Sequence, residues 1–193
     1  MTYSCAIFED LDGDLKNSTH DRGSWSGGEA LERIGADRVF PASPSTLHQA
    51  QLRKLRHIIS KADIRPGHRV LEIGSGWGSL AIEAVRLTGC TVDTITLSVH
   101  QQALAQQRIQ EAGFDDKIKV HLMDYRQMPD EWAGAFDRFV SIEMLEEVGK
   151  EFLNEYWKVV DWALKRKGGV GVVQVITIPE ARESAWAACA LVF

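Results

Sequence analysis

The segment Arg69–Ser79, with the sequence RVLEIGSGWGS, constrains the fold more than any other stretch of the chain. Its residues 70–73 predict a buried strand, and Gly74, Gly76 and Gly78 follow at alternate positions. Glycine adopts backbone conformations that other residues avoid, and it lets the main chain approach a ligand closely. The N–H groups of the helix expected next would then point at that ligand. The segment therefore predicts a strand, a glycine-rich turn and a helix beside a small molecule. A tight turn without a ligand is the alternative.

Strands and helices alternate through the rest of the chain. Further strands are expected at 91–97, 118–123, 137–142 and 171–178, and helices at 45–62, 80–87, 98–111 and 151–164. Alternation of this kind predicts an α/β fold, Rossmann-like, with a mainly parallel five-stranded sheet and right-handed connections. A ligand is then expected outside the carboxyl ends of the strands.

Composition narrows the class of protein and the domain division. The chain has 193 residues, 45% hydrophobic and 25% charged, which is typical of one globular domain. Residues 9–44 are rich in Gly, Ser, Asp and Asn, so residues 1–44 are expected to form an N-terminal segment and loop insertion. Residues 45–182 are expected to form the core and 183–193 a divergent tail. The net charge of −5 and the lack of a long basic run argue against a nucleic-acid partner.

The three cysteines and the N-terminus bear on localisation. Cys5, Cys90 and Cys189 are far apart and in no metal-binding spacing, so no metal site is expected. A reduced, cytoplasmic compartment fits best. The N-terminus has neither a basic region nor an apolar core, so no signal peptide is expected, and no apolar run approaches the roughly 20 residues of a membrane span.

Four expected strand ends deliver polar side chains to one edge of the sheet. In chain order these are Glu72, Thr96, Ser98, Gln101, Gln102, Asp124, Tyr125, Arg126, Glu143, Glu146 and Glu147. Glu72 could meet a cationic or hydroxyl-bearing ligand group, Asp124 could accept a hydrogen bond from an adenine amino group, and Tyr125 could flank the ring. The alternatives are that Asp124 only forms a turn, Ser98 only caps a helix, and Tyr125 only packs at the rim.

Seven motifs carry a resemblance to a known family. They are YSCA at 3–6, AQLRKL at 50–55, LEIGSGWG at 71–78, TLSVHQ at 96–101, DYR at 124–126, SIEMLEEVG at 141–149 and QVITIPEAR at 174–182. The spacing E-x-G-x-G-x-G differs from the G-x-G-x-x-G of dinucleotide sites and is typical of S-adenosylmethionine methyltransferases. Together the motifs resemble the cyclopropane-fatty-acyl-phospholipid synthases, which include the mycolic acid cyclopropane synthases.

The resemblance implies a class I methyltransferase core that transfers a methylene group from S-adenosylmethionine to the cis double bond of an unsaturated phospholipid or other lipid acyl chain. Glu146 matches a glutamate that holds a bicarbonate ion, which takes up a proton, and the backbone near Cys5 and Ile178 lines that pocket. Cys5 is otherwise expected to be a small packed residue rather than a nucleophile. The donor-binding residues implied are Tyr3, Ser4, Glu72, Gly74, Gly76, Trp77, Gly78, Thr96, Ser98, Gln101, Asp124 and Tyr125.

Departures from the family pattern leave other functions open. Glu147 and Ile176 stand where many relatives have histidine, and Gln174 is a candidate substitute. Family chains continue past the fifth strand, so the last strands are expected to be missing and strand 171–178 to become an edge. The alternatives are C-methylation of another lipid, such as a sphingolipid, and an inactive truncated fragment. Peripheral membrane contact is compatible with a lipid substrate, but the basic residues of 45–62 are expected to form a solvated face. The sequence indicates no oligomeric state.

Overall fold

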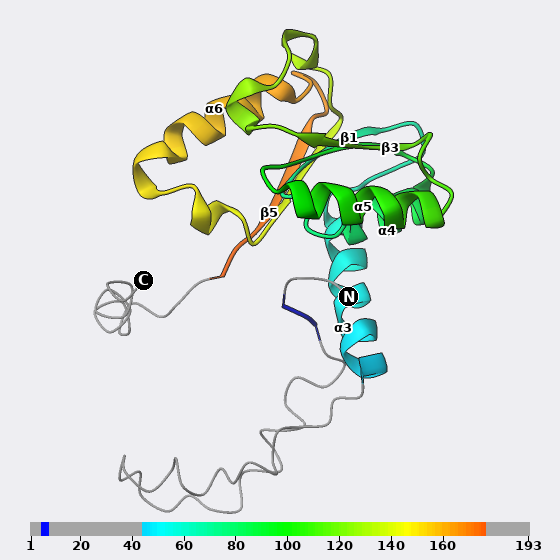
Figure 1. Ribbon diagram of the computed structural model, residues 1–193. Helices are drawn as coiled ribbons and strands as arrows, with labels where there is room; N and C mark the ends of the chain where they lie inside the picture. Colours follow the sequence, from blue (N-terminus) through cyan, green and yellow to red (C-terminus); the bar gives the residue numbers. More distant parts are fainter. Residues whose placement is uncertain (1–4, 8–43, 177–193) are drawn as a thin grey trace, which may run out of the picture.

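A five-stranded parallel sheet forms the centre of the protein. The computed structural model describes residues 5–7 and 44–176 (Figure 1). The strands are β1 (Arg69–Ile73), β2 (Thr91–Thr96), β3 (Ile118–Leu122), β4 (Arg138–Ile142) and β5 (Val170–Gln174). Their order is β3-β2-β1-β4-β5, and each neighbouring pair is parallel. The predicted α/β fold with a mainly parallel sheet is confirmed, and the switch in strand order falls between β1 and β4, where a ligand crevice is expected.

Helices cover both faces of the sheet. On one face lie α3 (Pro44–Lys61), α4 (Ser79–Thr88) and α5 (Val99–Glu111), and on the other lies α6 (Leu153–Ala163) (Figure 1). Short 3-10 turns complete the connections: η2 (Tyr125–Gln127), η3 (Asp130–Trp132), η4 (Leu145–Glu147) and η5 (Lys150–Phe152). Between β3 and β4, where the sequence predicted no helix, the connection consists of η2 and η3. Pro129 and Gly134 interrupt this segment, because proline lacks an N–H and glycine disfavours helix.

The fifth strand is shorter than expected. The strand predicted over 171–178 is observed as Val170–Gln174, and Ile176 is already 60% exposed. In the described part of the chain β5 pairs only with β4, so it forms an edge of the sheet, as expected.

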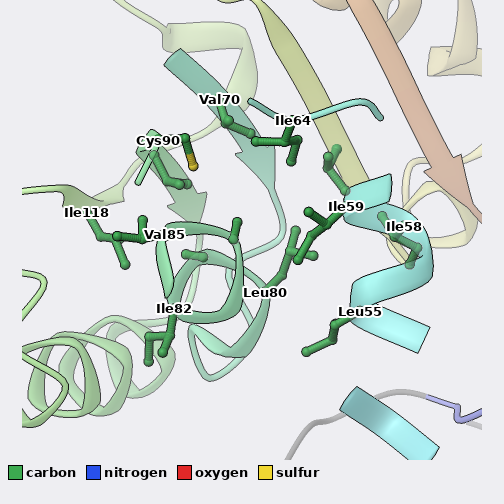
Figure 2. Close-up of a cluster of buried hydrophobic side chains, with 14 of the residues drawn as sticks. Leu55, Ile58, Ile59, Ile64, Val70, Leu80, Ile82, Val85, Cys90 and Ile118 are labelled. Carbon is green, nitrogen blue, oxygen red and sulfur yellow. The ribbon is translucent and has the colours of Figure 1, made fainter. Parts of the chain in front are cut away.

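Residues of the central strands alternate between two cores. Val70 of β1 packs with α3 and α4, and its neighbour Leu71 packs on the α6 face. The first core holds Leu55, Ile58, Ile59, Leu80, Val85 and Cys90, which lie between α3, α4 and the sheet (Figure 2). Each fully buried aliphatic side chain contributes about 1.5–3 kcal/mol. Because both faces are covered, the strand preceding the glycine turn reads as an almost continuous apolar run.

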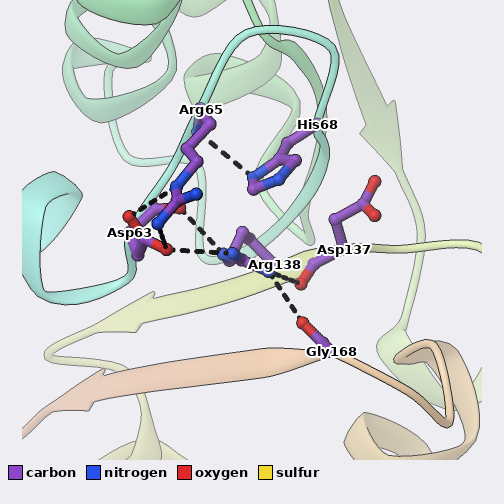
Figure 3. Close-up of polar contacts among 6 residues, drawn as sticks. All are labelled: Asp63, Arg65, His68, Asp137, Arg138 and Gly168. Atoms are coloured by element: carbon purple, nitrogen blue, oxygen red, sulfur yellow. Dashed lines mark hydrogen bonds and ion pairs between the residues drawn. The ribbon is translucent and has the colours of Figure 1, made fainter.

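A polar network fastens the amino ends of the strands, opposite to the glycine turn. The Arg138 guanidinium, 7% exposed, donates to the carbonyl oxygens of Asp63, Asp137 and Gly168 at 3.0, 2.7 and 2.9 Å (Figure 3). Asp63 adopts a positive φ of 50° at the end of α3 and forms an ion pair with Arg65 at 2.8 Å. Arg138 thus joins the end of α3, β4 and the turn before β5.

Replacing Arg138 with alanine is expected to lower the free energy of unfolding by about 2–4 kcal/mol, because three backbone carbonyls lose a charged donor. Urea denaturation measures this change. Arg166→Ala is the matched control, since that side chain is 84% exposed and lies 3.6 Å from Asp161. It should cost less than about 0.5 kcal/mol. Equal effects of the two substitutions would contradict the role given to Arg138.

Candidate donor-binding site

The glycine turn after β1 forms the floor of the candidate site. Gly74, Gly76 and Gly78 have φ values of +100°, +49° and +75°, in the region that favours glycine. The N–H groups of Gly74 and Ser75 both donate to the Ile95 carbonyl, at 3.0 and 3.1 Å, which fixes the turn against β2. No side chain caps the start of α4. The first N–H groups of that helix are therefore available to a ligand.

Two adjoining cavities lie at the carboxyl ends of the strands. The first has a volume of about 400 Å³ and lies at the ends of β1, β2 and β3. The second has a volume of about 350 Å³ and lies along the glycine turn. Gly74, Gln101, Met144 and Glu147 line both, so the two cavities are halves of one cleft. Ligand sites in proteins usually occupy about 300–1,000 Å³.

Most of the predicted donor-binding residues lie along this cleft. The second cavity is lined by Glu72, Gly74, Gly76 and Trp77, and the first by Thr96, Ser98, Gln101, Asp124 and Tyr125. Gly78 packs against α5 instead, since a Cβ added there would come within 3.3 Å of the Ala105 Cβ. Tyr3, Ser4 and Ile178 lie outside the described residues. The role of each residue in donor binding remains a prediction.

Glu72 is buried with one oxygen unsatisfied. It is 3% exposed, and its Oε2 atom has no hydrogen-bond partner among the described residues. Burial raises the pKa of this carboxyl group from 4.5 to about 8, and a hydrogen bond with Thr94 offsets only part of that effect. An unpaired carboxyl oxygen in the wall of a cavity suits a cationic or hydrogen-bond-donating ligand group.

Asp124 forms a turn and an ion pair. Its carboxylate accepts from the Arg126 backbone N–H at 2.9 Å and contacts Arg126 Nη2 at 2.6 Å. The hydrogen bond from the Arg126 side chain lowers the pKa of Asp124. The alternative reading of Asp124 as a turn former therefore holds, while it also lines the first cavity. Tyr125 packs edge to face on Tyr156, with ring centroids 5.3 Å apart.

Gln101 is held in place by two neighbours. The Thr96 hydroxyl donates to Gln101 Oε1 at 2.7 Å. The Ser98 Oγ accepts from the Gln101 backbone N–H at 3.2 Å, which makes Ser98 the N-cap of α5, as its alternative reading proposed. With Oε1 occupied, the Gln101 amide nitrogen is left to donate hydrogen bonds where the two cavities meet.

Replacing Gln101 with alanine is expected to weaken donor binding by about tenfold, the value of one lost ligand hydrogen bond. Thr96→Val should weaken donor binding less, because the Gln101 amide then loses only the hydrogen bond from the Thr96 hydroxyl and can still bond the donor. Isothermal titration calorimetry with S-adenosylmethionine measures both. The control is Gln107→Ala, whose side chain bonds Glu111 at 2.8 Å away from both cavities. Unchanged affinity in Q101A would remove Gln101 from the site.

A cluster that sequence reasoning missed lies at the wall of the second cavity. Lys54 of α3 was expected on a solvated face, but it is 2% exposed and its Nζ lies 3.5 Å from Glu143 Oε1. The expectation is wrong because Lys54 stands four residues from both Ala50 and Ile58 on the buried side of the helix. That spacing was the signal in the sequence. Glu143, one of the polar residues expected at the strand ends, lines the cavity.

Cys5 donates its backbone N–H to both Glu143 oxygens, at 3.0 and 3.3 Å. Burial alone would raise the pKa of Glu143, but the hydrogen bonds from Cys5 and the Lys54 charge outweigh it and hold the pKa below its usual value. Cys5 is an exposed residue rather than a packed one, but partial burial of its thiol and the hydrogen bond with Glu143 raise the pKa of that thiol. A thiol in this state is a poor nucleophile, in line with the sequence analysis.

The residues that the family resemblance assigns to a bicarbonate ion already have other hydrogen-bond partners. The Cys5 N–H is already bonded to Glu143, and Glu146 accepts from the Ile176 N–H. The Gln174 amide nitrogen lies 3.7 Å from Cys5 Sγ, and its buried Oε1 has no partner among the described residues. An additional anion would face the Glu143 and Glu146 carboxylates and the Gln174 amide oxygen, and the nearby Lys54 ammonium already pairs with Glu143. The described residues therefore do not fit a bicarbonate ion.

Two further features are settled within the described residues. No group of three or more His, Cys, Asp or Glu side chains in residues 5–7 and 44–176 is arranged to hold a metal ion. No helix in the same ranges is long and apolar enough to cross a membrane.

Comparison with known proteins identifies the family to which this chain belongs. Residues 36–193 match the family model described as mycolic acid cyclopropane synthetase. The chain belongs to this family. The resemblance drawn from the seven motifs is confirmed. The match to the mycolic acid cyclopropane synthetase family also includes residues 183–193, which the sequence analysis set apart as a tail; the domain boundaries remain predictions.

Relatives within the cyclopropane synthetase family are similar over most of this chain. Tuberculostearic acid methyltransferase UfaA1 of Mycobacterium tuberculosis is 37% identical over 182 residues, covering 94% of this chain and 35% of that protein. The cyclopropane-fatty-acyl-phospholipid synthase of Escherichia coli strain K12 is 41% identical over 122 residues, covering 63% of this chain and 30% of that protein. The chain thus spans about a third of the length of these curated relatives.

Solved structures of the cyclopropane synthase family share the fold. The cyclopropane synthase MmaA2 of Mycobacterium tuberculosis has a TM-score of 0.71 and 25% identity, covering 98% of this chain and 56% of that chain. The mycolic acid cyclopropane synthase CmaA1, solved with SAH and CTAB, has a TM-score of 0.63 and 26% identity, covering 89% of this chain and 47% of that chain. The fold is that of a class I methyltransferase core.

Proposed function

We propose that this chain provides the donor-binding core of an S-adenosylmethionine-dependent methyltransferase, which acts on the double bond of an unsaturated lipid acyl chain. The observation that carries the proposal is the cleft beside the glycine turn, which Gln101 lines and in whose wall the buried Glu72 has an unsatisfied carboxyl oxygen. The family match and the SAH bound in the CmaA1 structure support the same donor.

The residues of the cleft fit the two ends of the donor. The apolar walls of the first cavity, together with Tyr125, suit an adenine ring, and Gln101 suits a ribose or carboxylate between the cavities. The buried carboxyl of Glu72 suits the cationic amino group of the methionine end. S-adenosylmethionine supplies an electrophilic methyl group on a sulfonium sulfur. The protein holds that group in line with the acceptor and excludes water, because an alkene is a weak nucleophile.

Apolar side chains around the first cavity favour a lipid acceptor. Leu97 and Phe152 line it and are 74% and 43% exposed. Exposed apolar groups at the mouth of a cleft suit an acyl chain. UfaA1 is named for a fatty acid and the E. coli relative for a fatty-acyl phospholipid, which supports the same acceptor class. Peripheral contact with a membrane, where such chains reside, belongs to this proposal.

A second candidate reaction is methyl branching without ring closure. The name of UfaA1, the relative that covers 94% of this chain, favours it because that protein is a methyltransferase of tuberculostearic acid. Both reactions use the same donor and an unsaturated acyl chain, so the cleft described above serves either one.

Lipid analysis of cells that express the chain tests the proposal. Cells rich in monounsaturated phospholipids are fed methionine with a trideuterated methyl group, and the lipids are examined by mass spectrometry. Ring closure retains two deuterium atoms in the product, because one leaves the transferred methyl group as a deuteron. Methyl branching retains three when the carbocation instead loses a proton from the acyl chain, which leaves a double bond in the product. The matched control is the chain with Gln101→Ala. Lipids without transferred deuterium, from a folded chain that binds the donor, would contradict the acceptor part of the proposal.

A further inference from the structure

Glu143 is built into the wall of the donor cleft in an unusual way. It directly follows β4 and has a φ of +48°, a left-handed conformation that a non-glycine residue adopts at a cost of roughly 1–2 kcal/mol. Its side chain is 14% exposed and lines the second cavity beside Glu72 and Gly74. Such strain persists only where surrounding contacts hold it, and it is common at active sites.

The contacts that hold Glu143 are those an anion would use. The Cys5 N–H donates to both carboxylate oxygens, at 3.0 and 3.3 Å, and the ammonium of Lys54, 2% exposed, lies 3.5 Å away. A buried ammonium needs a nearby negative charge, because an uncompensated charge is costly to remove from water. The carboxylate of Glu143 supplies that charge from within the chain.

We propose that the Glu143 carboxylate stands in for the bicarbonate ion that the family resemblance implies, and serves as the proton acceptor of this site. The inference rests on the proposed function. When the alkene carbon bonds to the donor methyl, the electron pair of the broken carbon–sulfur bond stays on sulfur and the acyl chain becomes a carbocation. A proton of the transferred methyl passes to a Glu143 oxygen, and the electron pair of that carbon–hydrogen bond closes the ring. The proton then leaves to solvent.

Bicarbonate binding to the purified chain tests the inference without requiring turnover. Titration of ¹³C-bicarbonate, followed by NMR line broadening, compares the wild type with Glu143→Gly. Glycine suits the φ of +48°, so this variant relieves strain while it frees the Cys5 N–H and removes the carboxylate beside Lys54. The wild type is expected to show no binding, and Glu143→Gly should bind bicarbonate with a Kd at least tenfold below the weakest Kd that the titration can detect. Thermal unfolding checks that the variant is folded.

Two control variants separate the contact from the charge. Glu147→Gln removes an exposed carboxylate from the same cleft and should leave bicarbonate binding undetectable. Glu143→Gln keeps an oxygen that can accept from Cys5, so it should also bind no bicarbonate. Binding of bicarbonate by the wild type, or no gain in folded Glu143→Gly, overturns the inference. A parallel titration with S-adenosylmethionine distinguishes the two proposals, because its failure counts against the proposed function alone.

Discussion

Replacing Gly74 with alanine is expected to weaken S-adenosylmethionine binding at least tenfold and to lower the free energy of unfolding by about 1–3 kcal/mol. The φ of Gly74 is +100°, beyond the left-handed conformation that alanine tolerates. A Cβ there would also lie 3.4 Å from Met144 Cβ and Cγ, where the two cavities meet. The substitution therefore strains the turn, and the backbone that lines the cleft must shift to relieve the strain. Calorimetric titration and urea denaturation measure the two effects.

Gly67→Ala separates loss of stability from loss of the site. Gly67 also has a positive φ, +82°, but a Cβ there would have no neighbour within 4 Å, and the residue lines neither cavity. This variant should lose similar stability and keep its affinity for the donor. If Gly67→Ala weakens binding as much as Gly74→Ala does, the effect is a general one on folding and the glycine turn has no special part in it.

Glu72 should make the stability of the protein fall as the pH rises from about 4.5 to about 8. Its folded pKa is raised to about 8 from 4.5 by burial, so in this range the native state keeps a proton that the unfolded state loses. The contribution of this group to stability is complete below pH 4.5 and is lost by about 1.4 kcal/mol per pH unit up to about pH 8. Glu72→Gln should remove this slope and be more stable than the wild type at pH 8.

Urea denaturation of both proteins at pH 5, 6.5 and 8 measures the difference. Glu147→Gln, which removes an exposed carboxylate, should differ from the wild type by a constant small amount. A constant difference for Glu72→Gln as well would show that Glu72 is ionised in the folded protein. If the cationic end of the donor pairs with Glu72, binding should also release a proton, and the Kd should fall about tenfold between pH 6 and 7.

The sequence was sufficient for the sheet and for the glycine turn, because both depend on local patterns. Apolar runs such as residues 70–73 predict buried strands, and the alternate glycines after them predict the left-handed turn. The alternative interpretation of Ser98, as a helix cap, is confirmed for the same reason, since its partner Gln101 is three residues away. The connection between β3 and β4, where no helix was predicted, consists of two 3-10 turns, and Trp132 packs edge to face on Phe136 there.

The Glu143 cluster could not be predicted, because its members are far apart in the chain. Glu143 is 89 residues from Lys54 and 138 from Cys5, and no local spacing relates them. Their contact depends on how α3 packs against the end of β4. The resemblance pointed to Cys5 and Glu146, but the structure pairs Cys5 with Glu143 and gives Glu146 to the Ile176 backbone. The turn after β4 determines that Glu143, rather than Glu146, accepts the hydrogen bond from the Cys5 N–H.

A crystal structure of the chain soaked with S-adenosylhomocysteine tests the central claim most directly. The adenine is expected in the cavity beside Tyr125 and the amino group against Glu72, with Gln101 hydrogen-bonded between them. An ordered ligand outside these two cavities, or an empty cleft at saturating concentration, would contradict the account.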